Sequence, residues 1–221
     1  MGIAIPQVVT SGRATGAQVI DGSLKFTANA KLERTPSSSG NQKTFTWSAW
    51  VKRCTTDTQC LFGAGETGTG GVQRAAIQIV SSQLNFFSDY NGSTGTTLQT
   101  TRVLRDLNSF YHIVVSVDVT QSTSSDRVKF YINGTQVTDF SSSNYPSNYN
   151  TAFNNTSRNH IIGLYANNDN DFNGHMSQVY FIDGQQLDAS YFGYTDGLTN
   201  TWKPKKYEGT FGTNGFYLPM D

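Results

Sequence analysis

Residues 172–188 constrain the fold of this chain more than any other stretch. Turn-forming Asp, Asn and Gly residues at 169–174 precede the apolar run 179–182, which stops at Asp183-Gly184, and Leu187 follows. Such turn residues mark chain reversals, and an apolar run this short between them fits a strand better than a helix. The segment therefore predicts a strand over residues 174–182 that ends in a tight turn.

Residues 44–52 carry the clearest alternation in the chain. Phe45, Trp47, Ala49 and Val51 fall on one face of a predicted strand, because side chains in a strand point alternately to its two sides. Trp50 falls on the other face, so either that face is also covered or it exposes an aromatic ring.

Similar strands follow along the chain, and helical periodicity is almost absent. Asn133-Gly134 predicts a tight hairpin between 128–132 and 136–137, and the apolar stretch 111–119 predicts a central strand. Further strands are expected at 19–26, 59–64, 75–80, 83–87, 98–104 and 160–164. The single helical candidate is a turn at 188–191. This pattern predicts an all-β sandwich or barrel.

Composition agrees and excludes several classes of protein. Aromatic residues make up 13% of the chain and argue for a packed core, while 16 acidic and 16 basic residues leave no basic field for nucleic acid. No apolar run is long enough to enter and span a bilayer, and residues 1–6 lack the features of a secretory signal. We expect no nucleic-acid partner and no membrane insertion.

Residues 1–17 differ from the rest of the chain. They are small and polar apart from Ile3, Ile5, Val8 and Val9, so we expect an N-terminal arm that packs on a neighbouring molecule or stays mobile. Residues 18–221 then form one sandwich domain.

Several segments in a fixed order carry a resemblance to a known family. They are SLKF (23–26), LERTPS (32–37), FTWSAWVKR (45–53), FYING (130–134), YP (145–146), FIDG (181–184), WKPKKY (202–207) and GTNGFY (212–217). With them the chain resembles laminin-G-like jelly-roll domains of the concanavalin A-like superfamily, especially those in virion proteins of marine and cyanobacterial bacteriophages. The resemblance implies a two-sheet antiparallel sandwich with an extended N-terminal arm on the exterior of a phage particle. It also implies a capsid decoration, fibre or tail component whose partners are other virion proteins and further copies of itself.

The loop 141–155 is the best candidate for glycan recognition. Tyr145, Tyr149 and Phe153 recur every four residues among Asn and Ser side chains, including Asn148. Aromatic rings can pack on the C–H faces of sugars, and the amides can bind hydroxyl groups. The alternative is a long crossover whose aromatic rings are tucked onto the sandwich, and Tyr145-Pro146 belongs to the shared family frame.

The sequence DNDFNG at 169–174 resembles the first half of a calcium loop. Tyr180 stands where an EF-hand needs a bidentate Glu, so an EF-hand is excluded. A looser Ca²⁺ site that uses Asp169, Asp171 and a carbonyl oxygen stays open, and the alternative is a turn with solvated carboxylates. We expect no other cofactor.

Cys54 and Cys60 are the only cysteines, on either side of a predicted hairpin tip. A disulfide across the hairpin and two separate thiols are both compatible with this spacing.

Enzyme signatures are weak throughout the chain. Glycosidases of this fold need paired carboxylates at a set spacing, but Glu33, Glu66 and Glu208 fall in separate predicted loops or edges. The GAGETG sequence at 63–68 precedes a strand rather than a helix, which argues against a dinucleotide site. We therefore expect a non-enzymatic virion surface protein, with a carbohydrate-binding adhesin as the alternative and a glycoside hydrolase as the weaker third.

Overall fold

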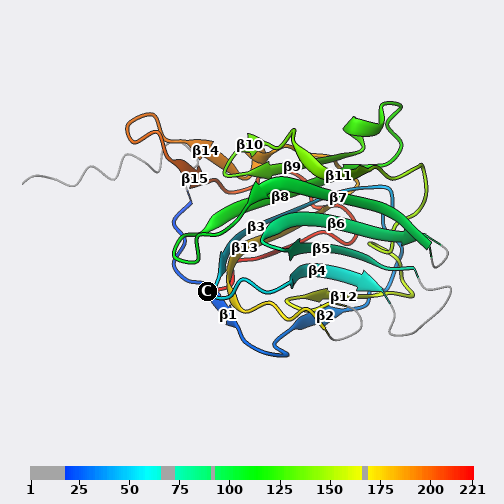
Figure 1. Cartoon of the computed structure of the whole chain (residues 1–221), viewed down its shortest axis with the longest axis horizontal. Coiled ribbons are helices and arrows are strands. Elements are labelled where there is room, and N and C mark those ends of the chain that lie inside the picture. Colours follow the sequence, from blue (N-terminus) through cyan, green and yellow to red (C-terminus); the bar gives the residue numbers. More distant parts are fainter. Residues whose placement is uncertain (1–17, 66–72, 91–92, 166–168) are drawn as a thin grey trace, which may run out of the picture.

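The computed structural model describes residues 18–65, 73–90, 93–165 and 169–221. Two antiparallel seven-stranded sheets pack face to face (Figure 1). The predicted all-β sandwich is therefore confirmed. The arm residues Ile3, Ile5, Val8 and Val9 lie outside the described residues.

The first sheet contains most of the strands that the sequence predicts. In spatial order it consists of β1 (Leu24–Phe26), β13 (Gly174–Asp183), β3 (Thr44–Arg53), β8 (Tyr111–Asp118), β9 (Val128–Ile132) and β10 (Thr135–Gln136), with β16 (Phe216–Leu218) also paired to β13. The apolar stretch at 111–119 is central, as predicted, because β8 lies between β3 and β9.

The second sheet has two short edge strands that the sequence did not reveal. Its order is β11 (Phe140–Asn144), β7 (Ser93–Val103), β6 (Gln83–Tyr90), β5 (Ala75–Val80), β4 (Gln59–Gly65), β12 (Asn159–Ile162) and β2 (Leu32–Arg34). Strand β11 occupies the start of the segment predicted as the loop 141–155.

Alternate side chains of the two sheets meet in one aromatic core. Trp47 and Phe181 of the first sheet are buried against Phe62 of the second. The Phe62 and Phe153 rings stack with centroids 4.9 Å apart. Burying each such side chain stabilises the fold by roughly 1.5–3 kcal/mol.

A third layer covers the outer face of the first sheet. We call residues 187–211 the cover layer; it includes the short helix η3 (Ala189–Tyr191) and the hairpin β14 (Gly193–Thr195) and β15 (Trp202–Pro204), which projects from the body in Figure 1. Its aromatic side chains pack on outward-facing residues of the sheet, among them Val114, Tyr131, Tyr180 and Ile182. This layer explains Trp50, whose ring lies 5.0 Å from that of His112 under the cover.

His112 fastens the cover layer to the sheet. The Trp202 Nε1–H group donates to His112 Nδ1 at 3.0 Å, so the imidazole proton lies on Nε2 and points to Ser48 Oγ at 2.9 Å. Burial lowers the pKa of His112 to about 3, and the ring is therefore neutral at physiological pH.

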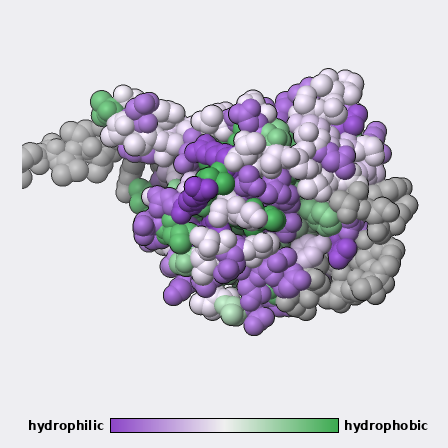
Figure 2. Space-filling model, viewed as in Figure 1, coloured by the Kyte–Doolittle hydropathy of each residue, from purple (hydrophilic) through white to green (hydrophobic). Residues whose placement is uncertain are grey.

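On the outer face of the second sheet, the described residues form only a small cluster, in which Tyr165 packs with Cys60 and Ala76. The middle strands of this sheet carry paired amides: Gln78 Nε2 donates to Asn85 Oδ1 at 3.0 Å, and Gln99 Nε2 donates to Gln83 Oε1 at 2.6 Å. Figure 2 shows polar and apolar residues mixed over the face seen in Figure 1.

Asp183 explains why the strand predicted at 174–182 stops where it does. Its carboxylate accepts the backbone N–H groups of Asn41 at 2.8 Å and Asn214 at 3.0 Å, and the side-chain amide of Asn154 at 3.1 Å. Gly184 follows with a φ of +86°, a conformation that favours glycine. The end of β13 thus joins three loops that are far apart in sequence.

Helices are minor elements of the described structure. The predicted turn at 188–191 is present as η3, with Asp188 accepting the N–H of Ser190, and η2 (Ser124–Asp126) was not predicted. No helix among the described residues is long and apolar enough to cross a bilayer.

Candidate functional site

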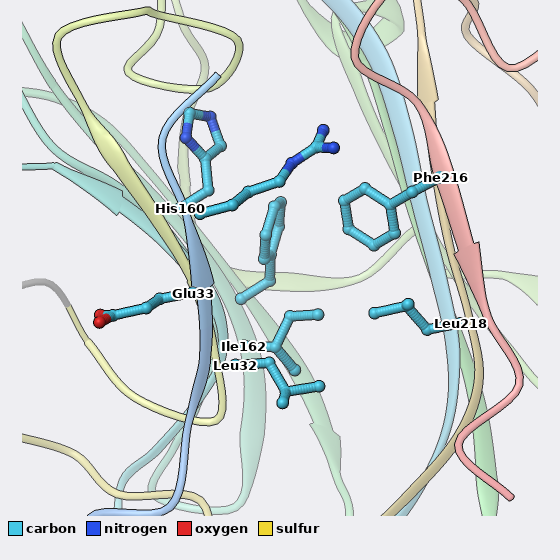
Figure 3. Close-up of a pocket in the computed structure, with 8 residues that line it drawn as sticks. Leu32, Glu33, His160, Ile162, Phe216 and Leu218 are labelled. Atoms are coloured by element: carbon cyan, nitrogen blue, oxygen red, sulfur yellow. The ribbon is translucent and has the colours of Figure 1, made fainter. Parts of the chain in front are cut away.

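An apolar pocket opens between the edges of the two sheets. We call it the edge pocket; it has a volume of about 150 Å³ and lies between strands β2, β12 and β4 on one side and β16 on the other (Figure 3). It is lined by Leu32, Glu33, Arg34, Phe62, His160, Ile162, Phe216 and Leu218.

Two three-residue strands, β2 and β16, form opposite walls of the edge pocket with their alternate side chains. Leu32 of β2 and Phe216 and Leu218 of β16 turn toward it, whereas Glu33 points away (Figure 3). On β16 the intervening Tyr217 packs on the other side, in the aromatic cluster under the cover layer. The walls are therefore mostly carbon, and the one acidic lining residue does not face the opening.

Arg34 supplies the one charged group that turns inward. Its guanidinium carbon lies 4.8 Å from the centre of the Phe216 ring, and its Nη2 donates to the Asn214 carbonyl. Burial lowers the pKa of Arg34, and the negative charge of Asp183 opposes that shift. A guanidinium keeps its charge in proteins, so this group is a fixed cation held against an aromatic wall.

His160 is not free to exchange protons at neutral pH. Its Nε2 accepts the Asn154 N–H at 2.8 Å, and its Nδ1 donates to the Arg158 carbonyl at 3.0 Å. Burial lowers the pKa of His160 to about 4. Both inward polar side chains of the edge pocket are thus engaged within the chain, and the pocket offers apolar contact rather than acid–base groups.

A second depression has the opposite chemistry. We call it the polar cleft; it has a volume of about 450 Å³ and is lined by Ala28, Thr55, Asp57, Thr58, Asn170, Asp171 and Asn173. The side chains of Asp57, Thr58, Asn170 and Asn173 make no hydrogen bond to another residue in the described ranges, so they are available to a polar ligand.

The predicted calcium residues lie at or near the polar cleft. Asp171 lines it and accepts the Asn29 N–H at 2.9 Å, whereas Asp169 is exposed and its carbonyl accepts the Tyr165 N–H at 3.1 Å. In the part of the chain that the structure describes, no three His, Cys, Asp or Glu side chains gather to hold a metal ion. The calcium site stays a prediction.

The four residues of the predicted glycan site are not brought together on the surface. Phe153 is fully buried in the core, and Tyr149 is 7% exposed with its hydroxyl 2.7 Å from Thr96 Oγ1. Tyr145 packs edge-on against Phe140, and Asn148 is exposed and accepts a hydrogen bond from Lys43. The prediction of a platform of three exposed rings is wrong, because burial in the sandwich removes Tyr149 and Phe153 from solvent and leaves only Tyr145 half-buried. The alternative of rings tucked onto the sandwich agrees with the structure.

The predicted disulfide is also absent. Cys54 and Cys60 are both free, Cys54 is exposed, and Cys60 is buried beside Ala76 and Tyr165 on the outer face of the second sheet. Burial raises the pKa of the Cys60 thiol, which keeps it protonated. The alternative of two separate thiols is therefore correct.

The edge pocket was not predicted from the sequence, and of the polar cleft the sequence analysis named only Asp171. Leu32 and Phe216 lie 184 positions apart, in strands too short to show a period. The one usable signal was that LERTPS and GTNGFY were both part of the family frame without an assigned structural role.

Comparisons with known proteins agree with this geometry. The laminin G family model of the concanavalin A-like lectin/glucanases superfamily matches residues 21–189, so the chain belongs to that family. No curated protein sequence matches the chain.

Two solved structures have the same fold at low sequence identity. Domains LG4-5 of the mouse laminin α1 chain are 12% identical with a TM-score of 0.54, and the match covers 87% of this chain and 48% of that one. The chain thus spans about half the length of that laminin structure. A serum amyloid P-like pentraxin of Limulus polyphemus is 14% identical with a TM-score of 0.53, and the match covers 89% of this chain and 93% of that one.

Proposed function

We propose that the protein is a non-enzymatic surface component of a bacteriophage particle, as a capsid decoration, fibre or tail protein. Its sandwich presents loops outward, and its association with copies of itself or other virion proteins holds it in place. The ordered motifs from SLKF to GTNGFY support the phage assignment, and the family match over residues 21–189 supports the lectin-like frame on which they lie.

The observation that carries the assembly role is the edge pocket. Its walls are apolar and partly exposed, and the inward side chains of Arg34 and His160 already have partners. Protein–protein contacts bury apolar cores of this kind inside a polar rim. The pocket therefore suits a side chain of a partner protein better than a reacting substrate.

Leu32 and Leu24 offer a matched test of this role. Both are leucines in three-residue edge strands, 38% and 39% exposed, but only Leu32 lines the edge pocket. We expect Leu32→Arg to weaken self-association or particle binding at least tenfold, while Leu24→Arg leaves both unchanged. Equal behaviour of the two variants would remove the edge pocket from the proposal.

The virion location has its own test. Antibodies against the protein should label the exterior of purified phage particles in electron micrographs, and mass spectrometry should find the chain in those particles. Failure to find the chain in purified particles would contradict the virion location but not the description of the fold.

The polar cleft favours one second function, the recognition of a host surface glycan. The Thr58 hydroxyl and the Asn170 and Asn173 amides that line it are groups of the kind that bind sugar hydroxyls. On a glycan array, Asn173→Ala should lose binding while Asn148→Ala, in the loop first predicted, keeps it. Binding that survives Asn173→Ala and Thr58→Ala would exclude the polar cleft.

A further inference from the structure

Strand β2 has a free edge in the described structure. It is the outermost strand of the second sheet, paired only with β12, with Leu32 opposite Ile162 and Arg34 opposite His160. All three of its residues are exposed. Edge strands present unpaired N–H and C=O groups on which another extended segment can add as a strand.

The two faces of β2 differ in what an added strand would meet. On the outward face, Glu33 accepts hydrogen bonds from Lys31 at 2.9 Å and Asn159 at 3.0 Å. On the inward face, Leu32 borders the edge pocket of about 150 Å³. An apolar cavity near that size holds a group as large as benzene, so the pocket has room for a branched aliphatic side chain.

The first residues of the chain have a sequence that suits the free edge of β2 and the edge pocket. No charged side chain occurs in residues 1–12, and Ile3 and Ile5 alternate around the small Ala4. Isoleucine favours strands, and Pro6 limits the strand to the residues before it. The segment Ile3-Ala4-Ile5 is therefore as long as β2, with apolar side chains for the pocket face and a methyl group for the Glu33 face.

We infer that Ile3-Ala4-Ile5 of a second copy adds to β2 as an antiparallel or parallel strand and inserts an isoleucine into the edge pocket. This inference rests on the proposed assembly function and names its partner. The contact is heterologous, because residues 3–5 of one copy bind β2 of the next. Repetition of such a contact builds a ring or a filament.

The position of Gln18 favours a second copy over the same chain. Gln18 is held by Pro204 of the cover layer and by Tyr217, through bonds of 3.1 Å and 2.8 Å. Tyr217 lies on the side of β16 opposite the edge pocket, and in Figure 1 the described chain begins beside β15, away from β2. Seventeen extended residues reach roughly 55–60 Å, which is enough to reach a neighbouring molecule.

Sedimentation velocity of the full chain over a concentration series tests both surfaces. Ile3→Asp/Ile5→Asp and Leu32→Arg should each raise the dissociation concentration at least tenfold. The controls Thr10→Asp/Ser11→Asp, with the same added charge in the same arm, and Leu24→Arg should behave like the wild type.

Cysteine crosslinking tests the pairing directly in a Cys54→Ser background. Copies with Ile5→Cys, opposite Leu32 in an antiparallel pairing, or with Ile3→Cys, opposite it in a parallel pairing, are mixed with copies that carry Leu32→Cys. One of the two mixtures should form a disulfide-linked dimer under mild oxidation, and no variant alone should do so to the same extent. A crosslink that forms only within one chain carrying both substitutions would overturn the choice of a second copy.

The outcomes separate this inference from the proposed function. If Leu32→Arg dissociates the assembly and Ile3→Asp/Ile5→Asp does not, the edge pocket is the contact but its occupant is wrong. Leu198→Ser then tests the projecting hairpin, whose tip residue Leu198 is 99% exposed. If the wild type is monomeric at every concentration, the inference fails, and particle binding of Leu32→Arg against the wild type then tests the assembly role of the pocket. If Leu32→Arg changes neither self-association nor particle binding, that role fails as well.

Discussion

The first sheet has apolar side chains in two places outside the core between the sheets, and the chain covers only one of them. Its outer face is covered by residues 187–211, which pack an aromatic cluster on Val114, Tyr131, Tyr180 and Ile182. Its edge at β16 borders a pocket that stays open, with Phe216 and Leu218 facing the gap to β2. An apolar surface that the chain covers itself stabilises the fold, whereas one that it leaves open is available to a partner.

The largest expected effect comes from breaking the cover. The Trp202 ring is flanked by Gly134 and Gly193, at each of which an added Cβ would lie 2.4 Å from the indole. Trp202→Ala removes the contacts of a partly buried ring and leaves His112 Nδ1 without its donor, so we expect a loss of about 3 kcal/mol in the free energy of unfolding, measured in urea. Tyr191→Ala, at a 46% exposed site, is the control and should cost far less.

The next effect concerns Asp183, which holds loops at the pocket end of the sandwich. Asp183→Asn removes an acceptor from N–H groups of Asn41, Asn154 or Asn214 and places an NH₂ group against a donor. We expect a loss of about 2–3 kcal/mol in the free energy of unfolding. Asp21→Asn, an exposed site, should stay within about 0.5 kcal/mol of the wild type, and an equal loss at both sites would contradict this role.

Acid should weaken the fold through His112 and His160, one under the cover and one at the edge pocket. Their folded pKa values are about 3 and about 4, below the usual 6.5, so the unfolded chain binds more protons as the pH falls. Stability is complete above about pH 6.5 and declines toward pH 4, by about 2 kcal/mol per histidine between pH 7 and pH 5. In His112→Gln the decline over that range should be about half as steep, and an unchanged slope would contradict the assignment.

Within the loop 141–155 we expect a smaller difference in the free energy of unfolding between substitutions at a buried and at an exposed residue. Tyr149→Phe removes the hydroxyl that bonds to Thr96 and should cost about 1 kcal/mol in the free energy of unfolding. Asn148→Ala should cost almost nothing, since that side chain is exposed. Thermal melts of the two variants measure both losses. An equally small loss in Tyr149→Phe and Asn148→Ala would contradict the burial of the Tyr149 hydroxyl.

The sequence predicted most of the longer strands because their apolar residues form recognisable runs or alternations, although β7 begins at Ser93 rather than at residue 98. Residues 75–80 and 128–132 match β5 and β9, and the Asn133-Gly134 hairpin is present. The short strands β2 and β16 were missed, because three residues cannot show an alternation.

The sites were harder to predict than the fold. Tyr149 and Phe153 had the composition of a glycan site, but composition does not say which way a ring faces. The edge pocket depends on pairing between strands at opposite ends of the chain, and the turn residues around Asp57 and Asn173 become a cleft only when three loops meet. Local patterns do not contain that information.

The most direct test of the central claim is sedimentation velocity of the wild type, Leu32→Arg and Leu24→Arg at equal concentrations, with melting temperatures measured in parallel. We predict that the wild type and Leu24→Arg associate, that Leu32→Arg sediments as a monomer, and that all three melt within a few degrees of one another. Association of Leu32→Arg at the wild-type concentration would contradict the claim that the edge pocket is the assembly site.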